Sequence, residues 1–256
     1  MIYSLMIFSY EARFYRGVQR LKIVAVIPAY NEEATIGAVV KQIKAHIPEA
    51  DVLVINDGSK DRTSQIASEA GASVVELPFN LGIGGAVQTG YLYARQNGYD
   101  IAVQVDADGQ HDPVYIRKLV EPLKNHKADM VIGSRYVAET AYKSTFSRRT
   151  GMIFFSTLVS ALTGQKVKDT TSGFRAVNKD VINYFVDNYP TDYPEVDVLI
   201  RLYKRHFRVV EVPVEMQERQ GGKSSITPIR SIYYMIKVSL SLIIGAMRTE
   251  EEKGGK

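Results

Sequence analysis

The chain has no cysteine, which excludes structural disulfides, thiolate metal sites and cysteine nucleophiles. The absence of cysteine does not identify the cellular compartment, because cytosolic proteins can also lack cysteine. Histidine is scarce too, and the four histidines are scattered along the chain, at His46, His111, His126 and His206. This scatter argues against a zinc site.

Long apolar runs are also missing. No run reaches the roughly 18 to 20 apolar residues that are needed to span a bilayer, so we do not expect an integral membrane protein. Residues 1–20 have a short apolar start that Glu11 and Arg13 interrupt, and they lack the basic lead, long apolar run and cleavage site of a signal peptide. We interpret these residues as an N-terminal extension.

Positive charge is only slightly in excess. The 32 Lys and Arg residues outnumber the 28 Asp and Glu residues by 4, which suits an anionic ligand or membrane surface but is too little to indicate nucleic acid. The 256 residues, 45% of them hydrophobic, suffice for one enzyme-sized domain with a buried core. We expect that domain at residues 21–228, followed by an apolar helix at 229–248 and a tail at 249–256.

Short apolar runs alternate with segments of helix length from residue 21 onward. The runs are KIVAVIPAY, DVLVIND, SVVELP, IAVQVDAD and DMVIGSR. This alternation predicts an α/β fold with a mostly parallel central sheet flanked by helices. The apolar residues of EEATIGAVVKQIKAHI recur at helical spacing, and Asp112-Pro113 fits a helix start. Ligands of such sheets bind at the carboxyl ends of the strands.

The pattern loosens beyond Arg135. We expect helices near residues 153–162 and 195–206, then a strand RVVEVPV and a Gly-rich basic loop ERQGGKSS. The last segment, IRSIYYMIKVSLSLIIGAMR, carries Arg230, Lys237 and Arg248 at intervals. This segment could form a buried packing helix or a helix that lies on a membrane surface, and both alternatives stay open.

The stretch VQVDADGQHDP ends an apolar run with clustered carboxylates. Asp106 and Asp108 are two residues apart, and alternate residues of an extended segment point the same way, so both can reach one hard cation. Mg²⁺ or Mn²⁺ is the natural choice, because these ions take oxygen ligands and share them with substrate phosphates. The alternative is a solvated turn that opens the next helix, which explains Asp112 but not the other two carboxylates.

Two further motifs have more ordinary interpretations. Asp57, in VINDGS, could accept hydrogen bonds from a base or ribose, but Asp-Gly-Ser is also common turn chemistry. The GIGG run at 82–85 could open a helix as in a dinucleotide fold, but Val87 stands where the third glycine of that fingerprint would fall. A dehydrogenase is therefore a weak alternative.

Seven motifs occur in a fixed order: VIPAYNEE, VINDGS, NLGIGGAVQTG, VDADGQHDP, GSRY, DTTSGFRA and ERQGGKSS. Together they resemble the family 2 glycosyltransferases of the GT-A fold, most closely the branch of dolichyl-phosphate mannose synthase and polyprenyl-phosphate sugar transferases. The resemblance covers roughly residues 22–240. One departure is Asn56-Asp57, where this family often has two acidic residues, so Asp57 is the only carboxylate for the base.

The resemblance implies metal-dependent, inverting transfer of a sugar from a UDP- or GDP-linked donor. The residues implied in donor binding are Pro28, Tyr30, Glu32, Asp57, Gly84, Asp106, Ala107 and Asp108. Asp106 and Asp108, with Gln110 as a further ligand, would hold the diphosphate through Mg²⁺ or Mn²⁺. Arg219 would close over the same diphosphate in a loop made mobile by Gly221-Gly222, unless this loop is a simple exposed basic turn.

Basic residues suit an acceptor that is itself a phosphate, because guanidinium groups bind phosphate oxygens in bidentate fashion. The set is Arg135, Lys143, Arg148 and Arg149. An ionised lipid phosphate needs no general base, whereas a sugar hydroxyl does. Candidate bases are Asp169, Glu195 and Asp197, and Asp197 joins Asp106, Asp108 and Arg219 as an expected catalytic residue. Each candidate base has a structural ion pair as its alternative.

We therefore expect a polyprenyl phosphate acceptor and a cytoplasmic protein that lies peripherally on the cytoplasmic face of the membrane. A hydroxyl acceptor, such as a saccharide, stays open as an alternative. So does a non-catalytic GT-A domain that serves as a partner protein. A homo-oligomer is compatible with the sequence, and a nucleic acid partner is not expected.

Overall fold

The structure is a computed structural model that describes residues 21–137, 146–190 and 194–217. Side chains are described for these ranges except at residues 146–152. The expected N-terminal extension, the apolar segment at 229–248 and the tail lie outside the described residues. Two of the expected phosphate-binding residues, Lys143 and Arg219, lie outside them as well.

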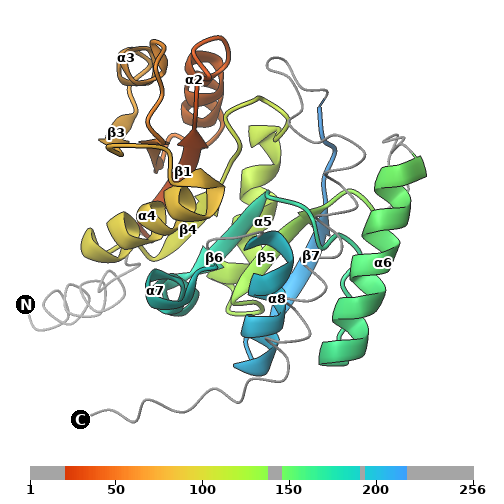
Figure 1. Ribbon diagram of the computed structural model, residues 1–256. Coiled ribbons are helices and arrows are strands. Elements are labelled where there is room, and N and C mark those ends of the chain that lie inside the picture. Colours follow the sequence, from red (N-terminus) through yellow and green to blue (C-terminus); the bar gives the residue numbers. More distant parts are fainter. Residues whose placement is uncertain (1–20, 138–145, 191–193, 218–256) are drawn as a thin grey trace, which may run out of the picture.

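Strands of the described residues form one sheet in the order β3-β2-β1-β4-β6-β5-β7 (Figure 1). The strands are β1 (Ile23–Ala29), β2 (Ala50–Asn56), β3 (Ser73–Glu76), β4 (Ile101–Gln104), β5 (Met130–Ser134), β6 (Arg175–Asn178) and β7 (Val209–Pro213). All neighbours pair in parallel except β6, which is antiparallel to both β4 and β5. The mostly parallel sheet is confirmed. β6 was not predicted, because its four residues, RAVN, are too few to show a pattern.

Helices connect most of the strands, as the alternation predicts. They are α2 (Ile36–His46), α3 (Thr63–Glu69), α4 (Gly82–Gln96), the 3₁₀ turn η1 (Pro113–Tyr115), α5 (Ile116–Lys124), α6 (Phe146–Thr163), α7 (Lys179–Asn188) and α8 (Pro194–Lys204). The expected helices near 153–162 and 195–206 are confirmed as α6 and α8. Within the described ranges, none of these helices has the length and apolar character to cross a membrane.

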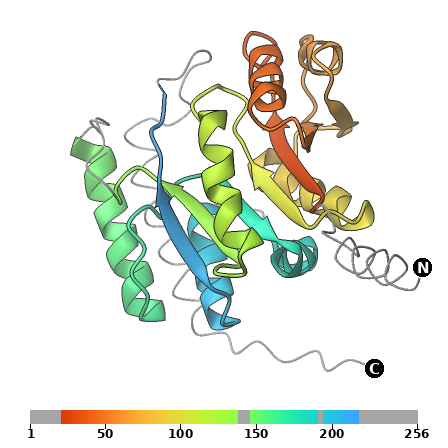
Figure 2. The same cartoon turned by 180° about the vertical axis from the view of Figure 1, so that it is seen from behind.

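The sheet is buried on both faces, and β1 shows how its sequence achieves this. Successive side chains of a strand point to opposite faces, so Val24 and Val26 belong to one core cluster while Ile23, Ala25 and Ile27 belong to the other. The first cluster takes in residues of α4, α6, α7 and α8, and the second takes in residues of α2, α3 and α5. Figures 1 and 2 show the resulting three layers from opposite sides.

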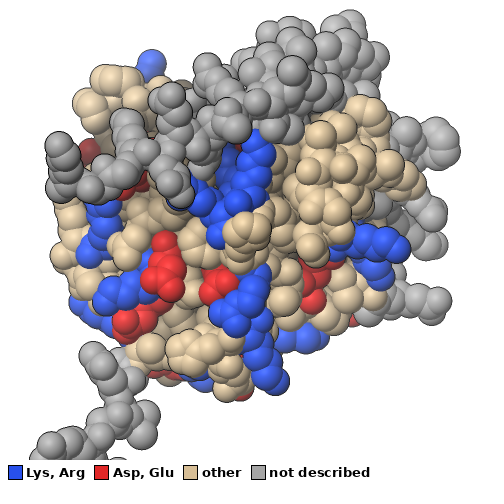
Figure 3. Space-filling view, turned by 90° about the horizontal axis from the view of Figure 1, so that it is seen from below, with Lys and Arg blue, Asp and Glu red and all other residues tan. Residues whose placement is uncertain are grey.

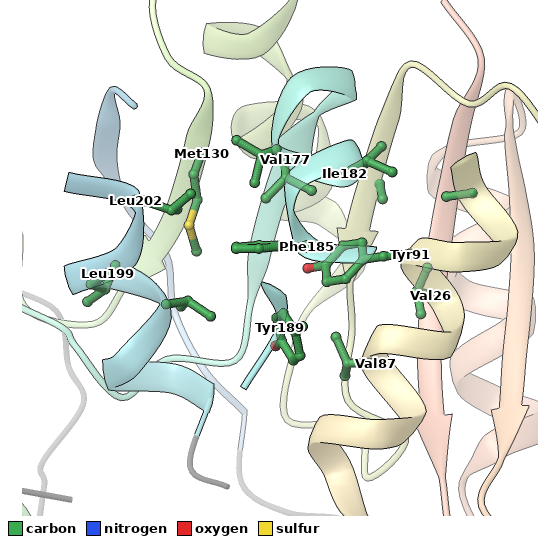
Figure 4. Packing of buried hydrophobic residues seen from close by; sticks show 14 of the residues in the cluster. Val26, Val87, Tyr91, Met130, Val177, Ile182, Phe185, Tyr189, Leu199 and Leu202 are labelled. Atoms are coloured by element: carbon green, nitrogen blue, oxygen red, sulfur yellow. The ribbon is translucent and has the colours of Figure 1, made fainter. Parts of the chain in front are cut away.

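Aromatic rings fill the first core between α4 and α7 (Figure 4). The Tyr91 ring centroid lies 5.2 Å from that of Phe185 and 5.4 Å from that of Tyr189, distances typical of stabilising ring pairs. Beside them, a Cβ atom at Gly90 would lie only 2.2 Å from Cγ1 of Val26. Glycine at this position therefore lets α4 pack closely on β1.

Some surface charges are paired. The Arg117 guanidinium lies 2.8 Å from the Glu49 carboxylate, and that of Arg208 lies 2.9 Å from Asp129. Figure 3 shows basic and acidic side chains interspersed on one face of the described part. Such exposed pairs contribute little to stability individually.

Candidate active site at the carboxyl edge of the sheet

The loops that follow β1 and β2 are tied together by hydrogen bonds. The Asn31 backbone N–H donates to the Ser59 hydroxyl at 2.9 Å, and the Glu32 backbone N–H donates to the Thr63 hydroxyl at 2.9 Å. Asn31 takes a left-handed backbone, with φ of 56°, which asparagine tolerates better than most residues. This cross-linked rim holds Tyr30 with 46% of its surface exposed.

Five of the eight expected donor residues are buried, namely Pro28, Asp57, Gly84, Ala107 and Asp108. Pro28 lies within β1 and Gly84 within the first turn of α4. Asp57 is 4% exposed, and its two carboxylate oxygens accept the backbone N–H groups of Leu81, at 2.6 Å, and Gly82, at 2.9 Å. Because Gly82 begins α4, this carboxylate binds the positive end of the helix. In the structure Asp57 fastens the loop before α4 to the end of β2.

The carboxylates of DADGQHD lie in a turn. β4 ends at Gln104, residues 107 and 108 form the turn, and Gly109 has a φ of 78°. The extended geometry that we expected between Asp106 and Asp108 is therefore wrong. The Asp106 side chain is 36% exposed, whereas Asp108 is 5% exposed and accepts the Gln110 backbone N–H at 3.0 Å. Ala107 between them is buried.

The oxygen ligands of this turn fit a hard cation that also binds a diphosphate. No group of three or more His, Asp or Glu side chains suited to a metal occurs among the residues that the structure describes. Mg²⁺ usually binds one or two carboxylates, substrate phosphates and water, so two carboxylates are sufficient. Gly173 lies close to this carboxylate, because a Cβ atom added there would lie 3.4 Å from Oδ1 of Asp106.

Arg135 follows β5 and is held by Asp169, which is fully buried. The guanidinium donates through Nε at 2.8 Å and through an Nη atom at 2.7 Å to the two carboxylate oxygens, and the Arg135 backbone N–H adds a third bond at 3.0 Å. Glu211 of β7 fixes Asp169 in turn by accepting its backbone N–H at 2.8 Å. The arginine is thus held in one orientation with 18% of its side chain exposed.

The other candidate bases lie in α8. Asp197 pairs with Arg201 one turn later, with 2.9 Å between the charged groups. Glu195 is partly buried, and burial raises the pKa of its carboxyl above the usual range; Arg175 opposes this shift, and the negative charge of Asp106 adds to it. Asp169 and Asp197 therefore take the ion-pair alternative.

Part of the expected site is not described in the structure. Arg148 and Arg149 lie in α6, but their side chains are not described. Arg219 comes two residues after Gln217, whose backbone N–H donates to the Gln110 carbonyl at 2.9 Å and whose side-chain amide donates to Asp112 at 3.0 Å. The described chain before Arg219 is therefore bound to the carboxylate turn.

Three residues near the site were missed by sequence reasoning. Gly173 stood in a quoted motif, DTTSGFRA, but without a role. Glu211 is an ordinary strand residue in the sequence. His111 lies inside the quoted carboxylate stretch, and only the fold shows that its ring Nδ1 accepts the Asp106 backbone N–H at 3.0 Å. No signal in the sequence marks the last two.

Comparisons with known proteins agree on one family. The family model of Glycosyl transferase family 2 matches residues 24–185. An undecaprenyl-phosphate mannosyltransferase of Micrococcus luteus is 29% identical over 81% of this chain and 88% of its own. A UDP-N-acetylglucosamine–dolichyl-phosphate N-acetylglucosaminyltransferase of Methanococcus voltae is 32% identical over 75% of this chain and 84% of its own.

A solved structure shows the same fold. Glucosyl-3-phosphoglycerate synthase from Mycobacterium tuberculosis, crystallised with Mn²⁺, UDP and phosphoglyceric acid, superposes with a TM-score of 0.69. The match covers 91% of this chain and 81% of that one, at 22% sequence identity. The likeness in architecture extends well beyond the segment that the family model matches.

Proposed function

Because this chain is a member of glycosyl transferase family 2, we propose that it transfers a sugar from a nucleoside diphosphate sugar to a polyprenyl phosphate. The single observation that carries the donor half is the partly exposed Asp106 carboxylate beside Asp108 at the end of a central strand. The names of the two relatives support the acceptor half, since both proteins act on lipid phosphates.

The donor diphosphate would lie against the turn at residues 106–110. Asp106 and Asp108, with the Gln110 side chain nearby, would hold a divalent cation, Mg²⁺ or Mn²⁺. When bound, such an ion neutralises the charge that develops on the leaving diphosphate. Tyr30 and Glu32, on the rim after β1, would border the nucleoside, and Asp57 would act there through the loop that it fastens. Arg219 would close over the diphosphate.

The acceptor phosphate would bind Arg135. Its Nε and one Nη atom donate to Asp169, and the same Nη atom donates to Thr171, so the guanidinium is held in one orientation. Lys143, Arg148 and Arg149 would add positive charge. Because a phosphate monoester is already ionised at neutral pH, it attacks the anomeric carbon without a base and inverts its configuration. Asp169 and Asp197 are engaged in ion pairs, which agrees with a reaction that needs no general base.

A hydroxyl acceptor is the second candidate, and Glu195 is the observation that favours it. Burial raises the pKa of its carboxyl, which is the direction that favours a general base, and the negative charge of Asp106 adds to this shift. With a hydroxyl acceptor, Glu195→Gln would abolish transfer. With a phosphate acceptor, the same variant would keep most of its activity.

A transfer assay tests the proposal. Purified full-length chain is mixed with polyprenyl phosphate in anionic liposomes and with labelled UDP- and GDP-sugars in turn, with Mn²⁺, with Mg²⁺ or with EDTA. We expect a labelled lipid product from one donor class, dependent on the metal and lost in Arg135→Ala. Co-sedimentation of the protein with the liposomes would support a peripheral membrane contact.

The control acceptor is a soluble saccharide with the same donors. Label appearing only on the saccharide would replace the lipid proposal with the hydroxyl alternative. If no acceptor is glycosylated and no nucleoside diphosphate binds in a metal-dependent manner, the proposed reaction is wrong.

A further inference from the structure

His111 occupies a closed position between the carboxylate turn and the rest of the sheet. Its side chain is 4% exposed, and its ring stacks on Phe174, with centroids 4.7 Å apart and planes at 10°. Its backbone pairs with Met216 in an isolated antiparallel bridge. The ring therefore has little freedom to turn.

This fixed ring contacts Asp106 at two points. Nδ1 accepts the Asp106 backbone N–H at 3.0 Å, so in the neutral ring the proton is on Nε2. Nε2 lies 3.5 Å from Oδ2 of the same aspartate. One histidine thus meets both the backbone and the carboxylate of the residue that is expected to hold the cation.

The backbone contact matters because of where the sheet stops. Val105 still donates its backbone N–H to Val26 of β1, at 3.0 Å, and the next backbone N–H is that of Asp106. Without an acceptor this partly buried N–H would be left unpaired, which is unfavourable. The His111 ring provides that acceptor, so the backbone hydrogen bonding continues for one residue beyond Val105.

We propose that His111 is a positioning residue for the donor site: through Nδ1 and Nε2 it holds Asp106 in the orientation in which its carboxylate can bind the cation of a metal–nucleoside diphosphate complex. The role rests on the proposed function. Partners of this kind, placed behind a ligand, typically change metal affinity by about 10- to 100-fold when they are removed.

Two substitutions of His111 distinguish the effect of its hydrogen-bond acceptor from the effect of its stacked ring. His111→Phe keeps a flat ring to stack on Phe174 but removes the acceptor. His111→Asn loses the ring but offers an amide oxygen close to the place of Nδ1. His46→Phe is the matched control, because His46 is exposed at the C-terminal end of α2, its ring is hydrogen-bonded to Gln42 of the same helix, and its bond with Arg117 uses the backbone carbonyl, which the substitution keeps.

The measurement is the affinity for UDP and for GDP by calorimetry, with Mn²⁺ and with EDTA, on full-length proteins. Bound Mn²⁺ is counted separately by electron paramagnetic resonance, and the melting temperature without ligand reports on folding. We expect His111→Phe to lose about 10- to 100-fold of the Mn²⁺-dependent gain in affinity. His111→Asn should recover part of this loss, even if it melts at a lower temperature, and His46→Phe should match the wild type.

Each other result contradicts the role. A full Mn²⁺-dependent gain in His111→Phe would overturn it while leaving the donor site intact. An equal loss in both variants would mean that an acceptor near the place of Nδ1 does not restore the affinity, which contradicts the proposed role. If the wild-type protein itself showed no metal-dependent gain, the proposed donor site would fail, and this role would fail with it.

Discussion

Two aspartates follow the two strands that flank β1, yet they are bound in opposite ways. Asp57, after β2, is 4% exposed, and both of its oxygens accept backbone N–H groups at the start of α4. Asp106, just beyond β4, is 36% exposed, and its contact with His111 engages its backbone N–H. In the sequence both are simply acidic residues after apolar strands.

The difference shows what makes a carboxylate available for chemistry. The negative charge of Asp57 is compensated by the helix N-terminus, so this residue stabilises the fold whether or not a ligand is present. The carboxylate of Asp106 lies close to Gly173 and is partly exposed, so a cation can reach it from the solvent. At the same edge of the sheet, Asp57 therefore stabilises the fold, whereas Asp106 is available to bind a ligand.

The largest effect should come from Asp106→Asn, which removes the charge but keeps the size of the side chain. We expect turnover to fall by at least about 100-fold, because stabilisation of the leaving group would be lost. The melting temperature without ligand should stay close to that of the wild type. Initial rates and calorimetry with Mn²⁺ or EDTA check this, and a retained Mn²⁺-dependent gain in affinity would refute the metal role.

A smaller effect, of a different kind, is expected from Asp57→Ala. The Leu81 N–H would lose its acceptor and the Gly82 N–H would keep only Asn80, which should lower the free energy of unfolding by about 1–3 kcal/mol. Urea denaturation measures this loss, and Asp57→Asn, which keeps one acceptor oxygen, should lose less. The Mn²⁺-dependent gain in nucleotide affinity should survive. Normal stability together with lost nucleotide affinity would restore Asp57 to the direct donor contact expected from the sequence.

The smallest effect should come from Asp129, the residue before β5 at the opposite edge of the sheet. Hydrogen bonds from the Arg208 side chain lower the pKa of the Asp129 carboxyl below its usual range, although burial opposes the shift. A lowered pKa contributes stability above the unfolded value, and this is lost as the pH falls through the folded value. Asp129→Asn should therefore melt a few degrees below the wild type at about pH 7.

The gap between the two melting temperatures should narrow as the pH falls below about 4. Thermal melts across this range provide the check. Asp129→Asn should bind nucleotide with the same metal dependence as the wild type. A constant gap at every pH would show that the lowered pKa does not contribute to stability.

The strands could be predicted from the sequence because parallel strands buried on both faces read as continuous apolar runs, as in IVAVIPA and ADVLVIN. β6 could not, since its four residues, RAVN, owe their place to antiparallel pairing with β4, about 75 residues earlier in the chain. The helix α7 between β6 and α8 was also missed, although Asn178 caps its first turn.

The candidate site was predictable in its residue types and less so in its contacts. Asp106 and Asp108 stand out because carboxylates end an apolar run. The bonds of Asp57 are made to backbone groups 24 and 25 residues away, which no side-chain pattern records. Likewise, the ring of His111 is oriented by Phe174, a residue 63 positions later, so its contact with Asp106 depends on the folded core.

The place of β6 also has a consequence for how the chain folds. β4 and β5 do not pair with each other, because β6 lies between them in the sheet. During synthesis, β1 to β4 can associate early, but β5 can join their sheet only after residues 175–178 have left the ribosome. The sheet is therefore completed by a late, long-range event, and until then the edge of β4 is open to incorrect pairing.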